Sequence, residues 1–204
     1  MTEAATQDFT RYVYSLREGY NEPQTRKAFH HAVPLRTIVI YCYDPRAVAI
    51  PTALAAIWPD EVYPGELVLD EAGSKIGSTA TIFPIVVAGG RAVDALRSIS
   101  IGQHLFGVQN IVVVHHTNCG TTSFTRNGLI DAFRAEQGVD LADVYEKDSI
   151  AISDFSHSLR HDVDLLRASP GVPKSATIFG LVYNIDTDQF TQLIQDRTSS
   201  QEST

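Results

Sequence analysis

The sequence lacks long apolar runs, is poor in cysteine and has no excess of positive charge, and each shortage excludes a class of protein. The run IVVV at residues 111–114 suits a buried strand, and no run reaches the length that a bilayer-spanning helix needs. A formal net charge of −8 disfavours contact with phosphate backbones and with anionic membranes. We therefore expect a small-molecule partner, and neither a nucleic acid nor a membrane.

Only two cysteines are present, Cys42 and Cys119, and each lies in a polar cluster at the end of an apolar segment. The first twenty residues begin acidic and lack the apolar stretch of a signal peptide, so we expect a cytoplasmic protein. A structural disulfide is disfavoured in that reducing compartment. Two widely separated thiols of this kind are more typical of metal ligands or catalytic groups.

The 204 residues, 44% of them hydrophobic, suffice for one domain with its own core. Strand patterns alternate with helical spacing, which predicts an α/β fold with a parallel sheet covered on both faces. Pro84 indicates that the second strand lies at an edge. The expected strands are 37–43, 82–87, 111–115 and 176–183, with a short last element at 189–194. The expected helices are 3–18, 47–57, 94–106, 123–136 and 149–168; residues 1–30 form a helical arm, 58–81 a loop insertion and 195–204 a frayed tail.

His116 and Cys119, in the segment HHTNCG at 115–120, have the spacing H-x-x-C. A tight turn at this spacing can direct an imidazole and a thiolate at one ion, and zinc accepts that mixture in a tetrahedral site. The spacing alone is weak evidence, because a free cysteine is often only a small buried residue. The cluster also follows the predicted strand 111–115, at the sheet edge where α/β proteins bind ligands.

Cys42, Asp44 and Arg46 alternate where the strand 37–43 ends, so an extended backbone would place them on one side. Cys42 can supply a third ligand, and Asp44 with Arg46 can form a charge-assisted pair beside it. Such an aspartate can accept a hydrogen bond from a metal-bound water, or it can swing in as a fourth ligand. The alternative is a surface Asp–Arg pair that contributes little.

Three protein ligands and one open position are typical of a catalytic zinc rather than a structural one. Bound zinc lowers the pKa of its water to about 7, so a hydroxide nucleophile exists at neutral pH. We predict one Zn²⁺ per chain on Cys42, His116 and Cys119, with Asp44 orienting the nucleophile and Arg46 holding Asp44. The rival is a cysteine hydrolase in which Cys119 or Cys42 attacks with His116, and a ligated thiolate would not be free to do so.

The order C-x-D-x-R, a Gly-Gly segment with a helix, and then H-x-x-C-G resembles the β-class carbonic anhydrases. Three further segments are similar to that family: AGGRAVDALRSI (88–99), LFGVQNIVVVHHTNCG (105–120) and SLRHDVDLLRASPGVPKSATIFGLVYNIDT (158–187). The doubled HHT and the short chain are most similar to its small clade, which includes hydrolases of carbonyl sulfide and carbon disulfide. The resemblance covers roughly half of the chain. It implies a four-stranded parallel sheet with an antiparallel edge strand, the same zinc ligands and Asp–Arg dyad, and a homodimer or dimer of dimers with the site at the interface.

Val86 and Val87 stand where that family usually has Arg-Asn, which would make the wall beside the metal more apolar. Such a wall suits a weakly polar linear substrate such as carbonyl sulfide, although repacking of the core explains the valines equally well. We therefore expect zinc-hydroxide attack on carbonyl sulfide, giving hydrogen sulfide and carbon dioxide, on carbon dioxide, giving bicarbonate, or on both. The alternatives are a pure carbonic anhydrase and a catalytically idle binding protein on the same scaffold. Val87, Ala88, Gly89 and Gly120 are expected to contact the substrate.

The remaining histidines carry weaker signals. His30 and His31 are expected in a solvated linker, and His115 is expected to orient a neighbour because it alternates away from the ligand that follows it. His157 and His161 lie one helical turn apart, a spacing that can bind metal. Their segment lacks the glutamate of a metalloprotease motif, so we expect a plain helix surface there.

Overall fold

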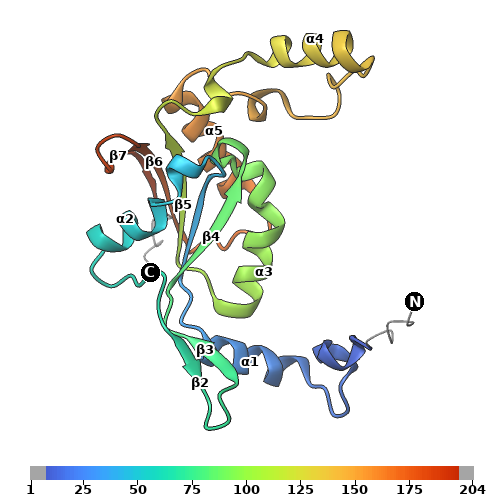
Figure 1. Ribbon diagram of the computed structural model, residues 1–204, viewed down its shortest axis with the longest axis vertical. Helices are drawn as coiled ribbons and strands as arrows, with labels where there is room; N and C mark the ends of the chain where they lie inside the picture. The colour runs from blue at the N-terminus through green and yellow to red at the C-terminus, as the bar shows by residue number, and fades with distance from the viewer. Residues whose placement is uncertain (1–7, 198–204) are drawn as a thin grey trace, which may run out of the picture.

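The structure is a computed structural model, and it describes residues 8–197 of the chain. Five strands form one sheet in the order β4-β1-β5-β6-β7 (Figure 1). Strands β4, β1, β5 and β6 run parallel and β7 pairs antiparallel with β6, which confirms the predicted sheet. The strands are β1 (Thr37–Cys42), β4 (Ile82–Val87), β5 (Asn110–His116), β6 (Thr177–Asn184) and β7 (Gln189–Asp196).

Alternate residues of the central strands pack into separate cores on the two faces of the sheet. The helices are α1 (Glu22–Ala32), α2 (Ile50–Ile57), α3 (Leu96–Phe106), α4 (Arg126–Gln137) and α5 (Phe155–Ala168). In β1, Ile38 and Ile40 join the core under α3 and α5, whereas Val39 and Tyr41 join the core under α2. Burial on both faces explains why this strand is an uninterrupted apolar run, as parallel strands between helix layers are.

Two segments project from this layered body on the same side (Figure 1). Helix α4 overhangs the carboxyl ends of the parallel strands, and Ile130 is its one buried residue. At the opposite end, residues 8–20 lead into α1. The predicted helix 3–18 is wrong where the structure describes it, because two 3-10 turns stand there and a regular helix begins only where Asn21 caps the backbone of Gln24. Residues 3–7 of that prediction lie outside the described residues.

The predicted loop insertion 58–81 contains a two-stranded antiparallel hairpin, β2 (Leu67–Leu69) and β3 (Lys75–Ser78). The hairpin lies beside α1 (Figure 1), and the contact is close: a Cβ on Gly77 would come 2.3 Å from the carbonyl oxygen of Ala32. Its strands are short, and β2 is exposed along its whole length. A strand without a buried face shows no alternation of apolar and polar residues, so the sequence pattern gave no signal for it.

Most of the other helix and strand boundaries differ from the predicted ones by a few residues. Strand β4 has the predicted bounds and lies at the sheet edge, as Pro84 indicated. Helix α5 begins at Phe155 rather than at 149, because Asp154 caps it. The predicted tail is wrong at its start, since Gln195 and Asp196 pair within β7, and residues 198–204 lie outside the described part. Within residues 8–197, no helix is long and apolar enough to cross a membrane.

Candidate metal centre

The carboxyl ends of β1 and β5 bring the two predicted clusters together. These strands are parallel neighbours, and Cys42 and His116 are their last residues. Asn118 has a positive φ of 56°, a conformation that asparagine tolerates better than most residues, and it turns the chain so that Cys119 returns to the strand ends. The order of the strands in the sheet therefore assembles a group whose members are far apart in the sequence.

Cys42, His116 and Cys119 converge as candidate ligands. One side-chain atom of each lies within 4.8 Å of the others, and the two sulfurs are 3.7 Å apart. The exposed fractions of the three residues are 3%, 0% and 2%. Two sulfurs and an imidazole nitrogen at this spacing match the ligand types and the size of a tetrahedral zinc site, in which metal–ligand distances are about 2.0–2.3 Å.

The imidazole of His116 is oriented for ligation. Its Nδ1 lies 3.0 Å from the carbonyl oxygen of Thr117, an arrangement in which Nδ1–H donates and Nε2 keeps its lone pair. Nε2 is buried and has no hydrogen-bond partner among the described residues. A buried polar atom without a partner is costly, and a cation shared with the two sulfurs would satisfy it. The residues present therefore fit a metal ion of the zinc type.

The two thiols differ in how readily they ionise. The pKa of Cys119 is held well below its ordinary value, chiefly by the hydrogen-bonded contact of its sulfur with that of Cys42 at 3.7 Å, and the hydroxyl of Thr121 lies 3.1 Å from the same atom. The pKa of Cys42 is raised because its proton is shared with Cys119 and because burial disfavours its charge. Cys119 is thus the more readily ionised sulfur, and a thiolate is the form that binds metal.

Asp44 and Arg46 form the predicted pair beside the candidate ligands. Arg46 donates through Nε to Oδ1 at 3.0 Å and through Nη2 to Oδ2 at 2.6 Å, and these bonds hold the pKa of Asp44 well below its usual range. Nη2 also donates to the carbonyl oxygen of Asn118 at 2.9 Å, so Arg46 ties the end of β1 to the turn after β5. The backbone does not stay extended after Cys42, because a 3-10 turn begins at Pro45, and this turn folds Arg46 back onto Asp44.

The segment 86–89 lies only partly where the sequence predicted a contact with the substrate. Ala88 and Gly120 line a cavity in front of the candidate ligands, whereas Val87 and Gly89 are not among its lining residues. Val87 packs against the core under α3 and α5, and Val86 is 47% exposed outside the cavity. In the single chain, neither valine lines this cavity.

Glycine allows this segment to lie directly against the strands. Gly90 has a φ of 67°, and a Cβ there would come 2.5 Å from the carbonyl oxygen of Val114 and 2.9 Å from the Cα of Tyr41. Because these are backbone atoms of β5 and β1, no side chain fits between the segment and the sheet. Both Gly89 and Gly90 have a positive φ, the conformation that glycine readily adopts in a tight turn.

A cavity of about 820 Å³ opens in front of the candidate ligands, beneath α4. Cys42, Asp44 and Cys119 contribute to its lining. Most of its apolar wall comes from α4 and the segments that flank this helix: Phe124, Leu129, Phe133, Leu141, Val144, Tyr145 and Ile150. Sequence reasoning missed this wall, although Leu129 and Phe133 have the four-residue spacing of one helix face.

Behind the candidate ligands lies a buried charged pair that sequence reasoning also missed. Arg91 donates to both oxygens of Asp162, at 2.9 and 3.0 Å, and the two side chains are 3% and 0% exposed. Arg91 also donates to the carbonyl oxygens of Asp148 at 2.7 Å and Ala151 at 3.1 Å. This side chain therefore holds the segment between α4 and α5 against the body of the protein.

The other histidines lie outside the group of three. His115 faces the α5 side of the sheet, where its Nε2 lies 2.9 Å from the hydroxyl of Ser158, and burial lowers its pKa to about 4. His30 and His31 lie in the last turn of α1, so the expected linker is wrong. His157 is exposed on α5, as predicted for a helix surface.

Comparisons with known proteins give relatives in sequence and in fold. No family model matches the chain. Beta-carbonic anhydrase 1 of Mycobacterium tuberculosis (H37Rv) is 30% identical over 100 residues, which cover 49% of this chain and 59% of that protein. Carbon disulfide hydrolase of Acidianus sp. (strain A1-3) is 29% identical over 136 residues, which cover 55% of this chain and 67% of that protein. The crystal structure of carbonic anhydrase from Streptococcus mutans superimposes with a TM-score of 0.59 at 26% identity, and the match covers 84% of this chain and 95% of that one. The chain thus spans about three-fifths of the length of the mycobacterial relative.

Proposed function

Because this chain is related in sequence and in fold to the β-carbonic anhydrases and carbon disulfide hydrolases, as its motifs predicted, we propose that it is a zinc enzyme acting on a small linear molecule of the carbon dioxide type. The observation that carries the proposal is the convergence of two sulfurs and one unpartnered imidazole nitrogen beside a cavity. Cys42, His116 and Cys119 would hold one Zn²⁺ per chain. Zinc bound there would supply a Lewis acid and lower the pKa of a water molecule toward about 7.

The protein's own residues would orient the water that attacks. Asp44 accepts hydrogen bonds from the backbone N–H and Nε of Arg46 on Oδ1 and from Nη2 on Oδ2, so Oδ2 keeps a further lone pair for another donor. Because its pKa is lowered, Asp44 stays ionised and acts as a hydrogen-bond acceptor rather than as a store for the proton. Arg46 would hold Asp44 in place, and its bond to Asn118 keeps the carboxylate at a fixed distance from the ligand turn.

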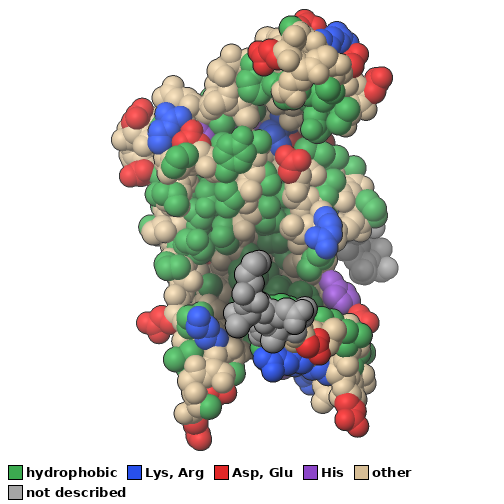
Figure 2. All heavy atoms as spheres, turned by 45° about the vertical axis from the view of Figure 1, so that its right-hand side comes forward, with side chains coloured by type: hydrophobic (Ala, Val, Ile, Leu, Met, Phe, Trp, Pro, Cys, Tyr) green, Lys and Arg blue, Asp and Glu red, His purple; other side chains and the backbone are tan. Residues whose placement is uncertain are grey.

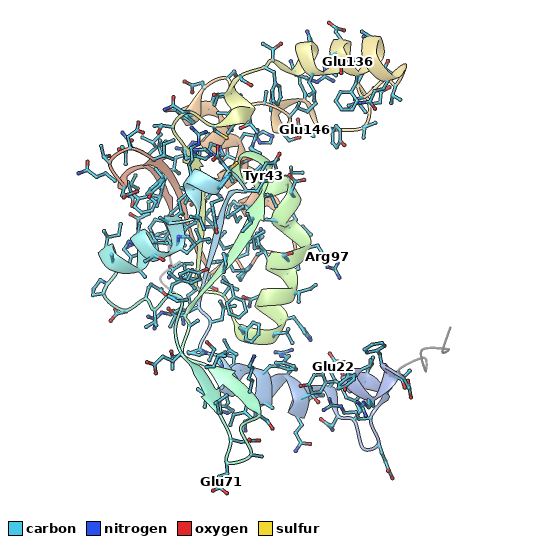
Figure 3. The ribbon with its side chains drawn as sticks, viewed as in Figure 1. Glu22, Tyr43, Glu71, Arg97, Glu136 and Glu146 are labelled. Carbon is cyan, nitrogen blue, oxygen red and sulfur yellow. The ribbon has the colours of Figure 1, made fainter. Side chains whose placement is uncertain are left out.

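Carbonyl sulfide is the substrate that we propose, with carbon dioxide as a second one. Addition of water to carbonyl sulfide breaks a carbon–sulfur bond and yields hydrogen sulfide and carbon dioxide, whereas addition to carbon dioxide yields bicarbonate and a proton. Support comes from the apolar wall under α4, including Leu129, Phe133 and Val144, which offers dispersion contacts to a weakly polar molecule. Tyr43, labelled in Figure 3, lines the same cavity from the side of the sheet.

We also propose that two copies of this single-domain chain associate and narrow each other's cavities. A cavity of about 820 Å³ is more than twenty times the ~30 Å³ that one water occupies in the liquid, so one chain alone encloses a three-atom substrate poorly. Figure 2 shows hydrophobic side chains spread over the face below the α4 overhang. Phe9, Tyr12 and Leu16 on the N-terminal segment are also exposed, and contiguous apolar surface of this kind marks an interface. A homodimer or a dimer of dimers would cover these surfaces, and the reducing cytoplasm would suit the two free thiols.

Paired substrate assays on protein of measured zinc content test this function. Hydrogen sulfide release from carbonyl sulfide and proton release from carbon dioxide hydration are measured on the same sample. We expect both rates to rise in proportion to the zinc content. If hydrogen sulfide does not form above the uncatalysed rate, carbonyl sulfide is excluded as the substrate. If neither product forms in zinc-replete protein, the chain is a binding protein and not an enzyme.

The substitution Asp44→Ala tests the role of the carboxylate. We expect one zinc per chain to remain and both rates to fall by about 100-fold or more, because the acceptor that orients the water is lost. Asp140→Ala is the matched control, since it removes an exposed aspartate that pairs with Arg134 at 2.7 Å and does not line the cavity. Unchanged turnover in Asp44→Ala contradicts the proposed role.

A further inference from the structure

A second group of metal-ligating side chains lies at the rim of the cavity, apart from the cysteine-containing centre. Glu146 and Asp148, from the segment between α4 and α5, and His161 of α5 each offer one ligand atom, and these atoms all lie within 4.8 Å of one another. Figure 3 shows Glu146 beneath α4, and this residue lines the cavity. Two carboxylates and one imidazole are ligands that a divalent transition metal accepts.

His161 is held with its outer nitrogen toward the two carboxylates. Its Nδ1 lies 3.3 Å from Oδ1 of Asp162, a fully buried carboxylate that Arg91 fixes from the other side. Its Nε2 lies 3.2 Å from Oε2 of Glu146. Metal-binding histidines usually have a carboxylate at their second ring nitrogen, and in the tautomer with Nδ1 protonated Asp162 would accept from it and leave Nε2 for an ion. Asp162 is outside the group of three, so it supports a ligand role for His161 independently of the three atoms' proximity.

The charges around the group also favour a cation. The charges of Arg91 and Asp162 neutralise each other in the interior. The Arg91 guanidinium lies 3.4 Å from Nδ1 of His161, whereas Nε2 of His161 faces Glu146. Glu146 and Asp148 place two negative charges on the open side of the ring, and a divalent cation would offset both. Lys147, between them in the sequence, is exposed.

We propose that Glu146, Asp148 and His161 bind a second divalent transition-metal ion at the rim of the cavity. The two carboxylates are exposed, so water would complete the coordination, and the affinity would be lower than at the centre with two sulfur ligands. Glu146, Ser149 and Ile150 line the cavity, so the ion would fasten the segment that forms one of its walls. This site does not depend on the proposed reaction.

Zinc titration by calorimetry tests the site on tag-free, full-length protein that already carries one zinc per chain. We expect a second, weaker equivalent, and we expect His161→Gln to weaken it by about tenfold or more. His157→Gln removes an exposed histidine one helical turn earlier and should leave the second equivalent unchanged. Cys119→Ser should remove the first equivalent and keep the second, which separates failure of this site from failure of the proposed active centre.

Two results would overturn the proposal. One is the absence of a second equivalent up to millimolar zinc. The other is a second equivalent that His161→Gln and Asp148→Asn both leave unchanged. Such an ion would bind elsewhere, and His161 and Glu146 would form only an ordinary ion pair. Circular dichroism checks that His161→Gln is folded, and Asp148→Asn, at an exposed position, supplies the same comparison if it is not.

Discussion

The candidate ligands and the apolar wall in front of them are built in different ways. Cys42 and His116 end buried central strands, and Gly90 lies directly against those strands without room for a side chain. The wall comes mainly from α4 and its flanking segments, and Ile130 is the one buried residue of that helix. Residues fixed by the core keep one geometry, whereas an element with few buried contacts can shift or change at little cost to the fold. We infer that the chemistry and the choice of substrate are separable in this molecule.

Removal of a ligand should abolish both reactions together, and this is the largest effect that we expect. Cys119→Ser takes away the more readily ionised sulfur of the pair, so zinc content should fall toward zero and both rates by about 100-fold or more. Metal analysis alongside the two assays measures this. Ser123→Ala, an exposed position in the same turn, is the control. A Cys119→Ser protein with full zinc and full turnover would show that this sulfur is not a ligand.

Disruption of the buried pair behind the ligands should lower the stability of the fold. Arg91→Met leaves Asp162 as an uncompensated buried charge, which lowers the free energy of unfolding by about 3–5 kcal/mol. Urea denaturation followed by circular dichroism measures the change. Arg134→Met breaks exposed ion pairs only and should cost far less. Equal losses in the two variants would contradict a structural role for the pair.

Loss of the hydroxyl beside Cys119 should have a moderate effect on the metal. Thr121→Val keeps the shape of the side chain and removes the group that lies 3.1 Å from the sulfur. We expect the affinity for zinc to fall by about tenfold, with the fold intact. Competition with a chelator measures this affinity, and an unchanged value would mean that the contact does not act on the thiolate.

Opening of the apolar wall should have the smallest effect, and it should act on one substrate. Phe133→Ala removes apolar contacts from the cavity, so the KM for carbonyl sulfide should rise by up to about tenfold while zinc content and the rate with carbon dioxide change little. Glu136→Ala, at the exposed position labelled on α4 in Figure 3, is the control. A parallel loss of both reactions would break the separation between chemistry and substrate choice.

The sequence predicted the parts of the site that the sheet fixes. Cys42 and His116 close apolar runs, and the carboxyl ends of parallel strands meet at one edge, so spacing and strand order were enough to bring them together. The Asp44–Arg46 pair was also predicted, although from an extended backbone conformation that the chain does not adopt there. Period-two alternation assumes an extended chain, and Pro45 begins a 3-10 turn there instead.

The parts of the molecule that sequence reasoning missed do not contact the core at regular intervals, so the sequence contains no repeating apolar pattern that predicts them. The apolar wall gathers residues from separate segments around an exposed helix, and no single window of sequence contains its pattern. The hairpin β2–β3 exposes most of its apolar residues, and the N-terminal aromatic residues from Phe9 to Tyr20 face away from this chain's own core. Because these apolar residues are exposed, they follow no pattern of burial that hydrophobic periodicity could report.

The hydrogen bond from Arg46 to the carbonyl oxygen of Asn118 joins the two halves of the ligand group through protein atoms alone. Together with the strand pairing behind it, this bond preorganises the sulfurs and the imidazole, so the group does not depend on an ion to gather it as zinc fingers do. A zinc ion bound there, as proposed, would meet ligands that the fold has already brought together, and its binding would not have to supply the free energy of folding.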